Sequence, residues 1–119
     1  MQYLLLIYGE EGALESVSEA ERHAVYEEYD RFAQDLQERQ AMVGGDELAP
    51  TSSATTVRVR DGETLATDGP FAETKEQLGG FYLVEAKDLD EAIKLGSGIP
   101  AVRTGSIEVR PIMPTPPVE

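Results

Sequence analysis

The stretch that decides the fold is DGPFAETKEQLGGFYLVEA, residues Asp68–Ala86. Its first residues interrupt the preceding strand, because Pro70 has no amide hydrogen to donate to a strand ladder and holds Gly69 extended. It closes with Phe81–Ala86, an apolar run typical of a core strand. Between the two, we expect one helical turn over Glu73–Leu78 and a lead into the strand at Gly79-Gly80. The stretch therefore divides the chain into two halves.

The first half opens with the apolar run Gln2–Tyr8, which does not alternate and predicts a strand buried on both faces in the middle of a sheet. Ser18-Glu-Ala-Glu21 matches a capping box and predicts a helix from about Glu19 to Gln40. The helix has one apolar stripe, made of Val25, Tyr29, Phe32 and Leu36. Met42-Val43 starts the next strand, and we expect Gly44-Gly45 to end this segment.

The middle of the chain predicts a β-hairpin. Thr55–Arg60 alternates between polar and apolar residues, as a half-exposed strand does. Asp61-Gly62 is a strong turn signal. Glu63–Thr67 then forms the short return strand.

The second half repeats the pattern of the first. Asp88 is predicted to cap a second helix that ends near Gly96 or Gly98. The residues expected to face inward from this helix are Leu89, Ala92 and Ile93. Ser106–Arg110 alternates as the last strand, and Pro111 ends it.

The resulting order is β-α-β, a hairpin, then β-α-β. This order predicts an α+β domain of the ferredoxin-like kind, with an antiparallel sheet and both helices on one face. The other face is left bare, so we expect two protomers to cover it as a homodimer resembling a dimeric α+β barrel. The domain is expected to span residues 1–112, with a flexible proline-rich tail over 113–119.

Composition narrows the function. The chain has 23 acidic against 10 basic residues and a net charge of -13, so we expect neither nucleic acid nor membrane lipid as a partner. Cysteine is missing, which excludes disulfides, thiolate catalysis and zinc–sulfur sites. We expect no metal and no cofactor.

The first apolar run is too short for a signal or membrane segment, and we expect a cytoplasmic protein.

The segment Asp68–Phe81 closely resembles the DGPF signature of YCII-related proteins. The resemblance extends to Tyr3–Tyr8 as the opening strand, and to Gly44-Gly45 with Leu48 and Pro50 as a mid-chain turn. It also covers Leu89–Ala92 and Ile107–Pro111, the second helix and the closing strand, and so nearly the whole chain.

The resemblance implies a ferredoxin-like fold and a dimer. Most such proteins have no established activity, and some occur fused or adjacent to alternative sigma factors, which implies a sigma-factor-related partner. Related YCII-type proteins were proposed to use a His–Asp pair. A relative is similar to dehydrochlorinases of aromatic breakdown, and muconolactone isomerases share the barrel.

The only histidine, His23, departs from the His–Asp pattern. It lies about 150° around the helix from the apolar stripe, so we expect it to point to solvent. Asp68 is then the candidate catalytic residue, as a general base. The alternative is that Asp68 accepts backbone N–H bonds within its own turn.

The candidate ligand-binding residues are Phe71, Glu73, Lys75, Arg110 and Tyr82. Phe71 could form an apolar wall, with Glu73 and Lys75 as a charged rim, or it could fill the core. Arg110 could orient a carboxylate and Tyr82 could donate its hydroxyl, although exposure and packing are the ordinary roles of such residues.

Three functional hypotheses follow. The first is a small-ligand-binding or regulatory dimer. The second is an isomerase or lyase acting on a small aromatic-derived compound, with Asp68 as base and Lys75 or Arg110 stabilising the anion. The third is a structural interaction module linked to transcriptional regulation, whose DGPF segment shapes the dimer interface.

Overall fold

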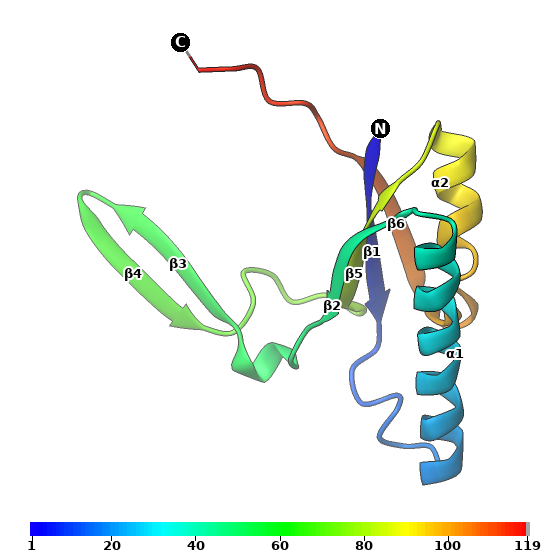
Figure 1. Cartoon of the computed structure of the whole chain (residues 1–119). Helices are drawn as coiled ribbons and strands as arrows, with labels where there is room; N and C mark the ends of the chain where they lie inside the picture. Colours follow the sequence, from blue (N-terminus) through cyan, green and yellow to red (C-terminus); the bar gives the residue numbers. More distant parts are fainter. Residues whose placement is uncertain (119) are drawn as a thin grey trace.

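The computed structural model describes residues 1–118 and has a four-stranded sheet at its centre (Figure 1). Its strands run in the order β2 (Met42–Glu47), β5 (Gln77–Glu85), β1 (Gln2–Gly9) and β6 (Ser106–Pro111), and every neighbouring pair is antiparallel. This order confirms the ferredoxin-like α+β fold. It also confirms that the opening strand lies inside the sheet. The prediction that this strand is buried on both faces is wrong for the single chain, because Tyr3 and Leu5 are buried whereas Leu4 and Leu6, on the face without helices, are only partly buried.

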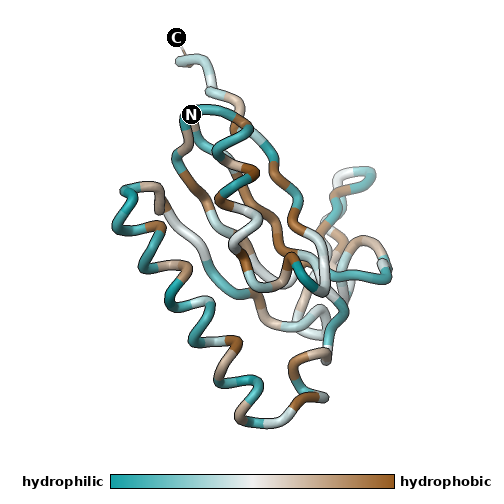
Figure 2. The backbone as a smooth tube through the Cα atoms, turned by 90° about the vertical axis from the view of Figure 1, so that its right-hand side faces the viewer, coloured by the Kyte–Doolittle hydropathy of each residue, from teal (hydrophilic) through white to brown (hydrophobic). Residues whose placement is uncertain are grey.

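Two helices, α1 (Glu19–Glu38) and α2 (Leu89–Gly96), cover the same face of the sheet (Figure 1). Along α1, hydrophobic residues recur at intervals between hydrophilic ones (Figure 2), as an amphipathic helix requires. The core lies between helices and sheet, and its fully buried side chains are Leu5, Leu36, Val84 and Ile99. The 3₁₀ turn η2 (Pro100–Arg103) joins α2 to β6.

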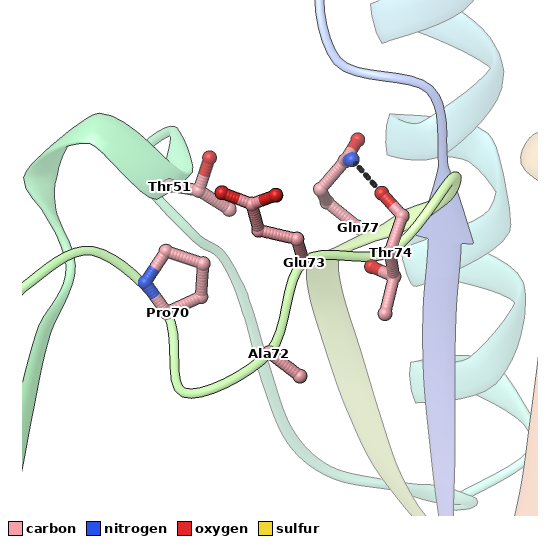
Figure 3. Close-up of a pocket in the computed structure, with 6 residues that line it drawn as sticks. All are labelled: Thr51, Pro70, Ala72, Glu73, Thr74 and Gln77. Atoms are coloured by element: carbon pink, nitrogen blue, oxygen red, sulfur yellow. Dashed lines mark hydrogen bonds between the residues drawn. The ribbon is translucent and has the colours of Figure 1, made fainter.

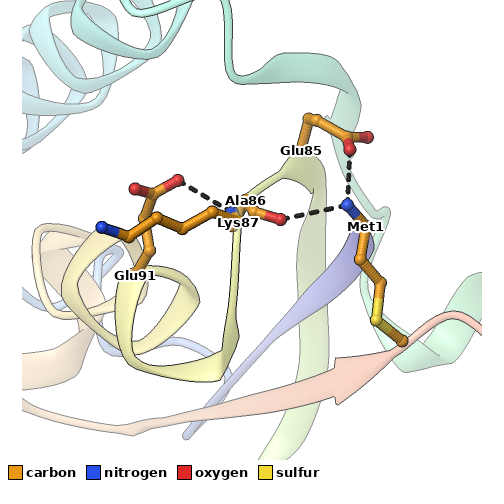
Figure 4. Close-up of polar contacts among 5 residues, drawn as sticks. All are labelled: Met1, Glu85, Ala86, Lys87 and Glu91. Carbon is orange, nitrogen blue, oxygen red and sulfur yellow. Dashed lines mark hydrogen bonds and ion pairs between the residues drawn. The ribbon is translucent and has the colours of Figure 1, made fainter.

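Both predicted helix starts are confirmed. The Glu21 amide donates to Ser18 Oγ at 3.1 Å, and the Glu91 amide donates to Asp88 Oδ1 at 2.9 Å. Each bond satisfies one of the amides that have no partner within the first helical turn. The Glu91 carboxylate also accepts from the Lys87 amide (Figure 4).

The end of β5 is tied to the start of β1. The Met1 ammonium donates to Glu85 at 2.6 Å and to the Ala86 carbonyl at 3.1 Å (Figure 4). These contacts lie beside the start of α2, so strand and helix are fixed together at this end of the sheet.

The hairpin is also as predicted, with β3 (Thr55–Arg60) and β4 (Glu63–Asp68) joined at Asp61-Gly62. It follows the 3₁₀ turn η1 (Thr51–Ser53) and projects away from the sheet, on the side opposite the helices (Figure 1). Its two strands form a separate sheet and have only marginal contact with any other described helix or strand.

Three further local predictions are wrong. Gly44-Gly45 does not form a turn but lies inside β2, where a Cβ on Gly45 would come within 2.8 Å of Tyr82 Cδ1 and the Phe81 carbonyl. Glu73–Leu78 contains no helical turn, because β5 already begins at Gln77. The glycine at position 45 is therefore explained by the close packing of β2 on β5 and not by a turn.

The third error concerns the inward face of α2. Leu89 and Ile93 are 48% and 49% exposed, and the buried residues of the helix are Ala92, Leu95 and Gly96. The helix turns Ala92, Leu95 and Gly96 toward the sheet, where Gly96 lies near Ile107 and Val109 of β6. Leu95 therefore takes the inward position that was predicted for Leu89 and Ile93.

Within residues 1–118, no helix combines the length and the apolar character needed to cross a membrane.

Candidate functional site

The candidate site is a groove of about 480 Å³ at the base of the hairpin. One wall continues the sheet, with Tyr8 and Leu78 paired across β1 and β5. The other wall comes from the hairpin and its two connections to the sheet. The lining residues on that side are Leu48, Ala49, Thr51, Ala54, Thr55, Thr56, Pro70, Phe71, Ala72 and Thr74.

The groove begins where the uncovered face of the sheet ends. Tyr3 and Leu5 point into the core, so Leu4, Leu6 and Tyr8 point to the opposite face, because side chains alternate along a strand. The register on β5 pairs these three with Leu83, Phe81 and Leu78. We call this surface the open face. Its apolar stripe runs without interruption into the groove.

A smaller hollow adjoins the groove and shares Thr51, Pro70, Ala72, Thr74 and Gln77 with it (Figure 3). Glu73 lines this hollow and points its carboxylate toward Thr51. The two spaces therefore form one site with an apolar interior and a polar rim.

The rim is held in place by its own hydrogen bonds. Gln77 Nε2 donates to the Thr74 carbonyl at 2.6 Å (Figure 3), and its Oε1 accepts from the Glu11 amide at 3.1 Å. The Glu11 carboxylate in turn accepts from Thr51, from the amide at 2.7 Å and from Oγ1 at 2.8 Å. Glu11 thus clamps the loop after β1 to η1.

The hydroxyls of the rim are donors to the protein itself. Thr51 donates to Glu11, Thr56 donates to the Gly69 carbonyl at 2.8 Å, and Thr74 donates to the Glu76 carbonyl at 2.5 Å. A hydroxyl that has given its hydrogen keeps its lone pairs as acceptors. Together with the Glu73 carboxylate, the rim therefore offers hydrogen-bond acceptors to a ligand.

Asp68 lies beside the groove. It is the exposed last residue of β4 and pairs directly with Thr55, which lines the groove. Directly opposed residues share a face of the ladder, with Cβ atoms about 5 Å apart. Asp68 does not itself line either hollow.

Of the candidate binding residues, the structure brings Phe71 and Glu73 to the site. Phe71 is 81% exposed in the single chain, so it forms an uncovered wall rather than core. Lys75 is exposed in the same connection, but it is not among the lining residues.

The other two candidates lie elsewhere. Arg110 is on β6, where it forms an ion pair with Glu108, and Glu108 also accepts from the Tyr8 hydroxyl at 3.4 Å. Tyr82 is on the helix side of the sheet, where its ring meets Phe32 edge to face at 5.1 Å. Burial, followed by the nearby Tyr29, raises the pKa of Tyr82 to about 12.

His23 points to solvent, as predicted. Its side chain is 76% exposed and lies 3.0 Å from Glu27 on the same helix. Across residues 1–118 there is no group of three or more His, Cys, Asp or Glu side chains that could hold a metal ion.

None of the rim threonines was predicted from the sequence as a site residue. Thr51, Thr55, Thr56 and Thr74 read as ordinary strand and loop residues, and their hydroxyls converge only because the hairpin folds out from the sheet. The one signal available was the hydroxyl-rich run Thr51–Thr56 directly before the hairpin strand.

Comparison with known proteins gives the family. The model of the YCII-related domain matches residues 1–116. An uncharacterized protein of Rhizobium meliloti (strain 1021) is 39% identical over 114 residues, which cover 94% of this chain and 92% of that protein. A match over nearly the whole chain, on a ferredoxin-like fold, shows that the chain belongs to the YCII-related family.

Proposed function

We propose that this protein is a homodimeric binding protein for a small aromatic or alicyclic amine or alcohol, which it holds in the groove at the hairpin base. The observation that carries the proposal is the chemistry of the groove, an apolar interior with a rim of acceptors. Its volume of about 480 Å³ lies within the usual range of small-molecule sites.

The polar rim selects the ligand. Acceptors such as Thr51 Oγ1 and the Glu73 carboxylate pair with an N–H or O–H group and repel a carboxylate. No Lys or Arg is found among the described lining residues, and the chain carries a net charge of -13. An anionic ligand of the same shape is therefore disfavoured.

The test uses two dyes that share an aromatic skeleton. N-phenyl-1-naphthylamine is neutral and carries one N–H donor, and 8-anilinonaphthalene-1-sulfonate adds an anionic group. We expect the neutral dye to bind with enhanced fluorescence and the anionic dye to bind at least tenfold more weakly.

A matched pair of variants locates the binding. Ala72→Phe fills a position shared by both hollows, and we expect it to weaken binding of the neutral dye at least tenfold. Ala24→Phe, at an exposed site on α1, should leave binding unchanged. Equal affinity in the two variants would show that the dye binds elsewhere.

An isomerase or lyase with Asp68 as base is the second candidate, favoured by the position of Asp68 opposite Thr55. Asp68→Asn should then abolish turnover of a bound hydroxyl-bearing aromatic and leave dye binding intact. Asp61→Asn, at the hairpin tip, is the control. If no donor-bearing ligand that binds is turned over by the wild-type protein, binding alone is the function.

A further inference from the structure

The two ends of the site differ in chemistry. The groove, of about 480 Å³, and the adjoining hollow, of about 340 Å³, share five lining residues, so one molecule can occupy both. Beyond the shared residues, the groove has the apolar walls of Leu48, Phe71 and Leu78 and the ring of Tyr8. The hollow adds a single residue, Glu73. The site therefore has an apolar end and an end with one carboxylate.

The side chains around Glu73 have no hydrogen left to donate to it. Thr51 gives both its amide and its hydroxyl hydrogen to Glu11. The Thr74 hydroxyl donates to the Glu76 carbonyl, and Gln77 Nε2 donates to the carbonyls of Thr74 and Lys75. A hydroxyl has one hydrogen and an amide nitrogen has two, so all of these donors are in use. A molecule that binds in the hollow must bring its own hydrogens.

The Glu73 carboxylate itself has no partner. It points toward Thr51 (Figure 3), and within residues 1–118 it forms no ion pair and accepts no hydrogen bond. Lys75, two residues along the chain, neither pairs with it nor lines the hollow. A carboxylate at the wall of a cavity, without a cation of its own, favours a cationic group in that cavity.

A second carboxylate strengthens this preference. Glu11 is bonded to Thr51, and Glu73 points toward the same residue, so two negative charges approach the hollow from different segments. An ammonium ion reduces the repulsion between them and donates charge-assisted hydrogen bonds, which are about twice as strong as neutral ones. A hydroxyl group of the same size leaves the repulsion in place. The hollow therefore separates an amine from an alcohol.

The apolar end determines where the nitrogen must sit on the ligand. An aromatic ring fits the groove, where Phe71 is 81% exposed and offers a flat wall. A nitrogen bonded directly to that ring would stay in the apolar groove, and it would be uncharged at neutral pH because arylamines are weak bases. An alkyl spacer between ring and nitrogen allows the nitrogen to reach the hollow and keeps it protonated.

We infer that the ligand is an arylalkylamine, bound as its ammonium ion with the nitrogen at Glu73 and the ring against Phe71. The inference rests on the proposed function and deepens it, because it excludes the alcohol and makes Glu73 the residue that determines specificity. The three hydrogens of the ammonium group match the acceptors of the hollow, which are the Glu73 carboxylate and the hydroxyl oxygens of Thr51 and Thr74.

The test compares two probes with one skeleton, 2-(1-naphthyl)ethylamine and 2-(1-naphthyl)ethanol, which differ only in the ammonium and hydroxyl groups. Isothermal titration calorimetry at pH 7 gives both affinities, and displacement of N-phenyl-1-naphthylamine shows that the probes occupy the same site. We expect the wild-type protein to bind the amine at least tenfold more tightly than the alcohol.

Three variants locate the charge that matters. Glu73→Gln keeps the shape of the exposed side chain and should weaken amine binding at least tenfold, while alcohol binding stays within twofold. Glu38→Gln, at an exposed site on α1, changes the net charge equally and should alter neither affinity. Asp46→Asn removes a carboxylate of the open face, where Asp46 pairs with Phe81, and should also alter neither.

The outcomes separate the two proposals. Equal affinity of the wild type for amine and alcohol overturns the inference and leaves the proposed function standing. An amine preference that disappears in Asp46→Asn, or equally in Glu38→Gln, also overturns the inference, because the cation would then lie elsewhere or respond only to net charge. If neither the probes nor the dye binds, the proposed function fails and the inference fails with it. A preference lost only in Glu73→Gln supports the inference.

Discussion

In the body of the molecule, Leu5, Leu36 and Val84 are fully buried, whereas in the hairpin Val57 and Val59 are more than half exposed. Both regions have regular sequences that predict their secondary structure. Local pattern alone therefore does not decide burial. The body closes on itself because two helices supply the second layer of its sheet, and the hairpin has no second layer within the same chain.

The sharpest test of this difference is a pair of truncations. Leu36→Ala removes a fully buried side chain from the core and should lower the free energy of unfolding by about 2–5 kcal/mol. Val57→Ala, measured at low protein concentration, should change it by less than about 0.5 kcal/mol. Urea unfolding followed by circular dichroism measures both. Similar losses in the two variants would mean that the hairpin is packed within one chain.

A second pair tests how tightly β2 lies on β5. Gly45→Ala places a methyl group against the Phe81 carbonyl and should cost about 1–3 kcal/mol. Gly44→Ala, one residue earlier, meets nothing within 4 Å and should cost far less. The same unfolding assay applies. If the order of the two costs is reversed, the register of β2 is wrong.

A third test uses alkaline pH to probe the helix layer. The folded pKa of Tyr82, about 12, lies above its unfolded value of 10.0 because burial disfavours the phenolate. The stabilisation is therefore fully present below pH 10 and is lost as pH rises toward 12. The loss should be less than about 1.4 kcal/mol per pH unit, since the ring is only partly buried.

Tyr82→Phe should flatten this dependence between pH 10 and 12, as measured by urea midpoints at several pH values. A wild-type protein that becomes more stable between pH 10 and pH 12 would have the opposite sign and would contradict the burial of the ring.

Most of the fold could be predicted from sequence because its signals are local. These signals depend on residues that lie within a few positions of one another in the sequence. They are the helix caps at Ser18 and Asp88, the turn at Asp61-Gly62 and the apolar strand Gln2–Tyr8. The errors fall where distant residues decide. The glycine at position 45 is required by the close approach of Tyr82 and Phe81 on the neighbouring strand. The inward face of α2 depends on how the helix lies against β6, where Leu95 and Gly96 rather than Leu89 and Ile93 meet the sheet.

The site was less predictable for the same reason. Phe71 and Glu73 come shortly after Pro70, and the structure places Phe71 at the groove and Glu73 at the adjoining hollow. The threonine hydroxyls and Tyr8 come from three separate segments that meet only at the hairpin base. Tyr82 and Arg110 have suitable chemistry, but alternation along their strands sends one to the helix side and the other to an ion pair.

The hydrogen bonds from Thr51 to the Glu11 carboxylate hold the base of the hairpin against the loop after β1. A small rotation of the hairpin about this base therefore produces a large displacement at its tip. Each strand has six residues and is about 20 Å long, so a rotation of about 10° at the base moves the tip by about 3.5 Å. The groove is lined both by residues of the sheet and by residues of the hairpin and its connections. A molecule bound in the groove would therefore fix the angle between sheet and hairpin. Under the proposed function, the size of the bound molecule would therefore set the position of the hairpin tip at Asp61 and Gly62.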